Sequence, residues 1–61
     1  MDEKEVIKRL NEHLKAKQQE NGYIREIDKN YSIHYVMDFL RLSKDDAKQF
    51  LKDNIPMAAT I

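Results

Sequence analysis

Three lysines near the C-terminal end of this chain, Lys44, Lys48 and Lys52, recur at intervals of four residues. On a helix this spacing places side chains along one face. Arg41 extends the stripe and Gln49 lies within it. A basic stripe of this kind can contact phosphates, while a glutamine amide can read adenine in the major groove of DNA. The candidate DNA contacts are therefore Arg41, Lys44, Lys48, Gln49 and Lys52.

The charge of the chain favours a second interpretation of this stripe. Eleven basic and eleven acidic residues give a formal net charge of zero, whereas DNA-binding domains are usually basic because their affinity comes largely from phosphate contacts. Asp45 would also lie close to the phosphates. The alternative is therefore a solvated face that carries mixed charges.

A second candidate surface is aromatic and apolar. Tyr35 and Phe39 are four residues apart, and aromatic side chains are enriched among the residues that dominate protein interfaces. The final residues, 57–61, are apolar and uncharged. Both groups could instead pack inside the fold, which is the alternative for so small a chain. The candidate protein-interface residues are Tyr35, Phe39, Met57 and Ile61.

Catalytic, metal and cofactor sites are not expected. The chain has no cysteine, two histidines and one glycine. Neither His13 nor His34 has a partner at a recognisable catalytic spacing, and Asp38, four residues after His34, suggests a local hydrogen bond. A glycine-rich phosphate loop and a zinc site need residues that are missing here. We expect a protein that is not an enzyme and that binds no metal or cofactor.

Two of the expected helices have clear start and stop signals. The first spans residues 3–20, because Asp2 and Glu5 form a capping-box pattern and Gly22 is a typical helix stop. The third spans residues 44–54. Ser43 caps its start in the same pattern, and a proline follows its end. Their apolar stripes consist of Val6, Ile7, Leu10 and Leu14 in the first helix and Ala47, Phe50 and Leu51 in the third.

The segment between these helices is less regular. Residues 23–27 are rich in β-branched and aromatic side chains and predict an extended segment, although a helical turn also fits. A helix is expected over residues 32–40, capped by Ser32 or Asn30. Its inward face consists of Ile33, Val36, Met37 and Leu40. A minimal strand pair formed by residues 23–27 and 57–61 is left open.

Residues 32–54 resemble a helix-turn-helix motif. The apolar and cap positions that carry the resemblance are Val36, Leu40, Leu42, Ser43, Ala47 and Phe50. Arg41 stands where that family prefers glycine, and Met37 stands where it prefers a small residue. The resemblance implies that the third helix contacts DNA and that the other helices support it.

These observations predict one all-α domain over residues 1–61, a compact three-helix bundle with a helix-turn-helix-like second and third helix. No apolar run is long enough to span a membrane, and we expect a cytoplasmic protein. The leading hypothesis is a DNA-binding or transcription-associated regulator that acts as a homodimer. The alternative is a protein-binding module or inhibitor of phage or mobile-element type. An oligomeric domain of another function is a third possibility.

Overall fold

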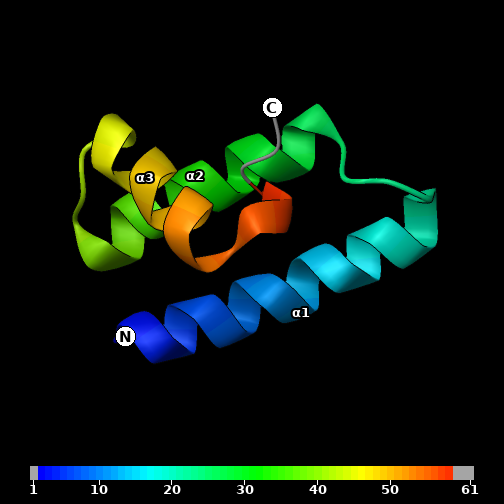
Figure 1. Ribbon diagram of the computed structural model, residues 1–61, viewed down its shortest axis with the longest axis horizontal. Helices are drawn as coiled ribbons and strands as arrows, with labels where there is room; N and C mark the ends of the chain where they lie inside the picture. The colour runs from blue at the N-terminus through cyan, green and yellow to red at the C-terminus, as the bar shows by residue number, and fades with distance from the viewer. Residues whose placement is uncertain (1, 59–61) are drawn as a thin grey trace.

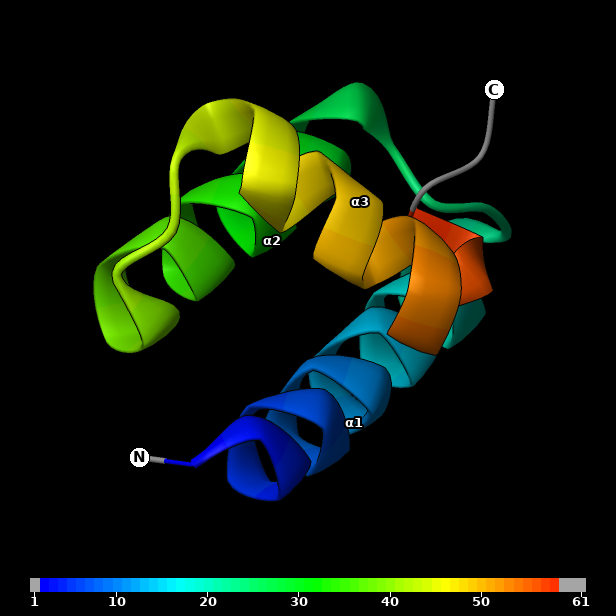
Figure 2. The same ribbon diagram turned by 60° about the vertical axis from the view of Figure 1, so that its left-hand side comes forward.

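The computed structural model describes residues 2–58, which form three helices and one short 3₁₀ turn. Helix α1 spans Glu3–Asn21, α2 spans Glu26–Leu40, α3 spans Lys44–Asn54, and the turn η1 spans Pro56–Ala58. Figure 1 shows α1 along one side of the molecule, α2 returning above it, and α3 packed against α2. The C-terminal end of α3 and η1 approach α1 and close the bundle (Figure 2). The predicted all-α three-helix arrangement is confirmed.

One apolar cluster holds the three helices together. The expected stripe of α1 contributes Val6, Leu10 and Leu14, all of them buried, while Ile7 is only partly buried. The other buried members come from α2, α3 and the segment after α3: Val36, Ala47, Leu51, Ile55 and Ala58. Burial of these side chains is the main favourable contribution to the stability of a domain this small.

The ends of α1 lie where local signals placed them, within one residue. The Asp2 carboxylate accepts a hydrogen bond from the Glu5 backbone N–H at 2.9 Å. At the other end Gly22 has a φ of 84°, and its N–H donates to the Gln18 carbonyl at 2.7 Å. A glycine adopts this left-handed conformation without the crowding that a side chain would cause.

Helix α2 begins at Glu26, so the predicted start at residue 32 was wrong. Arg25 is the N-cap, and the Asp28 carboxylate accepts a hydrogen bond from its backbone N–H at 3.1 Å. The same carboxylate accepts from Nε and Nη2 of Arg25, at 3.1 and 3.2 Å. Ser32 is buried inside the helix, where its hydroxyl donates to the Asp28 carbonyl at 3.0 Å. Neither Ser32 nor Asn30 is therefore the cap.

The strand pair left open for residues 23–27 and 57–61 is not formed by the described residues. Tyr23 to Arg25 form an irregular connection, and the two residues that follow belong to α2. Residues 57 and 58 belong to η1, where the Ala58 N–H donates to the Ile55 carbonyl at 3.0 Å. Residues 59–61 lie outside the described part of the chain. The cap at Arg25 starts a helix where the β-branched residues predicted an extended segment.

The turn between α2 and α3 is the segment whose sequence resembles the helix-turn-helix family. Arg41 adopts a left-handed conformation, with φ 55° and ψ 47°, at the position where that family prefers glycine. The Ser43 hydroxyl then accepts a hydrogen bond from the Asp46 N–H at 3.2 Å and caps α3, which has the predicted bounds. Ala47 is fully buried in the core, and Met37 packs partly buried against it.

Candidate functional site

An apolar row runs along one side of α2. Its members are four residues apart, so they follow one ridge of the helix: Ile27, Tyr31, Tyr35 and Phe39. We call them the α2 row. The exposed fraction is 66% for Ile27, 46% for Tyr31 and 47% for Phe39. Within residues 2–58, every exposed large hydrophobic side chain belongs to this row or is Tyr23, shortly before α2.

The rings of this row contact one another and a histidine of α1. The His13 ring stacks on Tyr31 with a centroid distance of 4.5 Å. Tyr31 and Tyr35 are 5.9 Å apart, and Tyr35 and Phe39 are 4.6 Å apart. Contacts at these distances are favourable and restrict the rotamers of each ring. The row is therefore a preorganised aromatic surface.

A polar row of α1 lies beside the α2 row and runs in the opposite direction. Its members also recur every four residues: Glu5, Arg9, His13 and Lys17. We call them the α1 row. Arg9 donates from Nε to the Glu5 carboxylate at 3.0 Å, which is the main reason that the pKa of Arg9 is raised, and Tyr35 contributes to the same shift. Arg9 thus lies beside Tyr35, as His13 lies beside Tyr31.

An ion pair fixes the N-terminal end of α2, where the α2 row begins. The Arg25 guanidinium and the Asp28 carboxylate are 3.1 Å apart, and the Asp28 side chain is only 5% exposed. The hydrogen bonds from Arg25 lower the pKa of Asp28, and the positive charge of Lys17 lowers it further. Helices α1 and α2 run in opposite directions (Figure 1), so the end of α1 that carries Lys17 lies toward the start of the α2 row.

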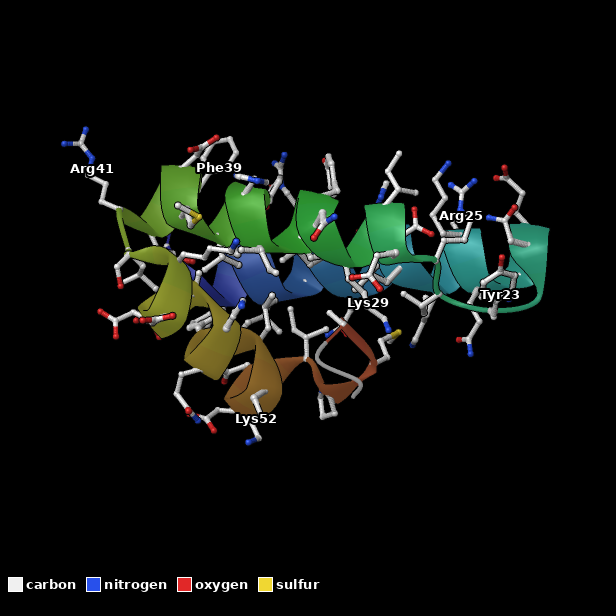
Figure 3. All side chains as sticks on the ribbon, turned by 90° about the horizontal axis from the view of Figure 1, so that it is seen from above. Tyr23, Arg25, Lys29, Phe39, Arg41 and Lys52 are labelled. Atoms are coloured by element: carbon white, nitrogen blue, oxygen red, sulfur yellow. The ribbon has the colours of Figure 1, made fainter. Side chains whose placement is uncertain are left out.

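The predicted DNA contacts lie on or next to α3 and are all exposed. Lys44, Lys48 and Lys52 follow one face of α3. The Gln49 amide donates a hydrogen bond to the Asp53 carboxylate at 3.0 Å, so an adenine would have to compete with Asp53 for it. Arg41 extends away from the side on which Lys52 lies (Figure 3). The structure therefore brings the lysines together but does not add Arg41 to their stripe.

The α2 row and the lysines of α3 lie on separate surfaces. Figure 3 shows Phe39 and Lys52 on opposite sides of α2. A partner bound to the α2 row would therefore leave the lysines of α3 accessible. The two candidate surfaces do not compete for space.

The predicted protein-interface residues have different environments. Phe39 is exposed and Tyr35 is partly buried within the row of rings. Met57 is partly buried against the core in η1, so it is less available to a partner. Ile61 lies outside the described residues. Ile27, Tyr31 and His13 were not among the predicted interface residues. The four-residue spacing of the first two was visible, but the predicted helix began too late to include them.

Residues 2–58 offer no site of two other kinds. No group of three or more His, Asp or Glu side chains is arranged there to hold a metal ion. No helix in this part of the chain has the length and apolar character needed to cross a membrane. His34 is exposed on α2.

Comparison of the chain with protein-family models, with curated proteins and with solved structures finds no match. The surfaces of the chain itself are therefore the evidence for its function. Of these surfaces, the α2 row combines exposure, apolar character and a fixed arrangement of side chains.

Proposed function

We propose that this chain is a small non-enzymatic protein-binding domain that docks on its partner through the α2 row. The observation that carries this proposal is the exposure of Ile27, Tyr31 and Phe39 along one ridge of a single helix. Contiguous exposed apolar side chains with a polar border are typical of protein interaction sites. The α1 row and the polar residues of α2 supply such a border.

The physical properties of the row suit binding. Burial of apolar surface contributes about 25 cal/mol per Å² removed from water, and large aromatic side chains often dominate the affinity of an interface. Binding is opposed by the loss of side-chain freedom. Tyr31, Tyr35 and Phe39 already contact one another, so part of that freedom is lost before a partner arrives.

DNA binding through α3 is the second candidate function. It is supported by the left-handed turn at Arg41, the Ser43 cap and the exposed lysines. Against it, three lysines of α3 are balanced by Asp45, Asp46 and Asp53. Because phosphate contacts supply most of the non-specific affinity for DNA, this balance makes α3 a weaker candidate than the α2 row.

Site-specific photo-crosslinking tests the docking function. A benzophenone amino acid replaces Phe39 in one variant and Lys48 in a matched variant, since both positions are exposed but lie on different surfaces. We expect covalent protein adducts from position 39 and few from position 48. Adducts at both positions in equal amounts, or none from position 39, would contradict docking through the α2 row.

A salt titration tests the second candidate. Binding to random duplex DNA is followed by fluorescence anisotropy for the wild type and for Lys48→Glu. Phosphate contacts predict binding that weakens steeply as salt rises and that is lost in the variant. The absence of binding at about 50 mM salt would rule out the DNA hypothesis. Docking through the α2 row predicts that Lys48→Glu leaves the crosslinks from position 39 unchanged.

A further inference from the structure

We infer that the occupant of the α2 row is the α2 row of a second copy of this chain, with the two α2 helices antiparallel. This inference rests on the proposed docking through α2 and names the partner. It follows from the alignment of two adjacent rows of side chains, one apolar and one charged. Each row can pair in antiparallel fashion with the same row of a second copy, as a two-fold dimer requires.

The apolar row can pair with itself. In a closed two-fold dimer, residue i of one copy contacts residue j of the other, and j contacts i. The centre of the α2 row lies between Tyr31 and Tyr35. Antiparallel pairing about this centre places Tyr31 against Tyr35 of the second copy and Ile27 against Phe39 of the second copy. Each copy then covers the apolar side chains that the other leaves exposed.

The same symmetry brings the two α1 rows together. A two-fold axis perpendicular to α2, in the plane of the interface, leaves both α1 helices on the same side of the paired α2 helices. Since His13 lies beside Tyr31 and Arg9 beside Tyr35, the centre of the α1 row coincides with that of the α2 row. Antiparallel pairing about this centre places Glu5 opposite Lys17 of the second copy.

The charges of the α1 row are complementary in this arrangement. Glu5 and Lys17 are at opposite ends of the row, so the dimer contains two symmetry-related pairs of opposite charge. A parallel arrangement would place the α1 helices on opposite sides of the α2 pair and would lose both pairs. The zero net charge of the chain also means that two copies do not repel one another overall.

The size of the surface is sufficient. A stable interface usually buries about 600–1,000 Å² on each partner, which is about a seventh to a quarter of the 4352 Å² accessible surface of this chain. The α1–α2 face is one broad side of a molecule whose principal extents are 30 × 22 × 17 Å. A side of this size can supply the area that a small dimer needs.

The test is a charge reversal at the two ends of the α1 row, measured by sedimentation equilibrium on the full chain. The wild type should form dimers as its concentration rises toward about 1 mM. Glu5→Lys and Lys17→Glu each replace two attractive pairs by two repulsive ones, so each should weaken self-association about tenfold. Lys15→Glu is the matched control for Lys17→Glu, because it makes the same charge change at an exposed position outside the row.

Mixing the two variants gives the decisive result. One copy with Lys at position 5 and one with Glu at position 17 restore both attractive pairs. The mixture should therefore form heterodimers with nearly wild-type affinity, which native mass spectrometry can identify by mass when one of the two variants is labelled with ¹⁵N. Circular dichroism of each variant checks that the helices are intact, since Glu5→Lys also removes the ion pair with Arg9 and Lys17→Glu removes the ion pair with Glu20.

Two results would overturn the inference. One is a wild type that remains monomeric at about 1 mM, and the other is a mixture that shows no preference for heterodimers. If the chain is monomeric but the probe at position 39 crosslinks to a different protein, the partner is not a second copy of this chain. Docking through the α2 row then still stands. If position 39 gives no crosslink to any protein, docking itself is refuted.

Discussion

Arg41, in the turn between α2 and α3, is a position where glycine should stabilise the protein. Its φ of 55° and ψ of 47° lie in the left-handed region, where the Cβ atom of an L-residue is crowded by the backbone. Among residues 2–58 its guanidinium makes no hydrogen bond or ion pair that the substitution would remove. Arg41→Gly therefore relieves backbone strain at little cost in side-chain contacts.

The expected gain is a difference between opposing effects. The left-handed conformation costs a residue with a side chain about 1–2 kcal/mol. Glycine makes the unfolded chain more flexible, which lowers stability by about 0.5–1 kcal/mol. Loss of a positive charge at the C-terminal end of α2 removes a further few tenths of a kcal/mol. The midpoints of these ranges leave a net gain of about 0.5 kcal/mol, which should raise the Tm of a chain this short by about 2–4 °C.

Gly22 provides the opposite substitution. Its φ is 84°, and a Cβ atom added there would meet no other atom within 4 Å. Gly22→Ala therefore introduces the cost of the left-handed conformation without a steric clash. It should lower the free energy of unfolding by about 1 kcal/mol.

Thermal and urea unfolding followed by far-ultraviolet circular dichroism measure both effects. Arg41→Lys is the control for Arg41→Gly, because it keeps the charge and the Cβ atom and should leave the Tm unchanged. The reasoning would be refuted if Arg41→Gly lowered the Tm, or if Arg41→Gly and Gly22→Ala shifted it in the same direction.

Two further predictions concern the positioning of α2. Ala47→Leu should lower stability by about 1–3 kcal/mol, because Ala47 is fully buried in the core that α2 and α3 share; an unchanged urea midpoint would show that the core has room for the larger side chain. Asp28→Asn should reduce the acid sensitivity of folding. The Arg25 hydrogen bonds hold the pKa of Asp28 below its ordinary value of 3.8, so its contribution is complete above that pH and is lost as the pH falls through the lowered pKa. Between about pH 5 and pH 2 the Tm of the wild type should fall more than that of Asp28→Asn, and equal decreases would assign the acid sensitivity to other groups.

The bounds of α1 and α3 were predictable because their signals are short-range. Asp2 and Ser43 each bond an N–H three residues further along the chain, and Gly22 needs only its own backbone freedom to end a helix. Such interactions depend on residues within one helical turn, so the order of residue types is enough to recognise them.

The start of α2 was not predictable by the same rules. Arginine is not a typical N-cap. Aspartate, the residue type at position 28, is common in turns as well as in the first turn of a helix. The helix begins there because the Asp28 carboxylate bonds both the backbone and the guanidinium of Arg25. Ser32 resembles a cap in sequence but bonds to the helix turn before it, and serine side chains adopt both roles.

The sequence by itself determined the three helices in outline, the composition of most of the core and the two candidate sets of surface residues. Only the tertiary structure decided that Ile27 and Tyr31 join Tyr35 and Phe39 in one exposed row, and that this row lies beside charged residues of α1. The contact between His13 and Tyr31 joins residues far apart in the chain. Such a contact depends on how α1 and α2 pack around their shared core, and that packing is a property of the whole fold rather than of any local pattern.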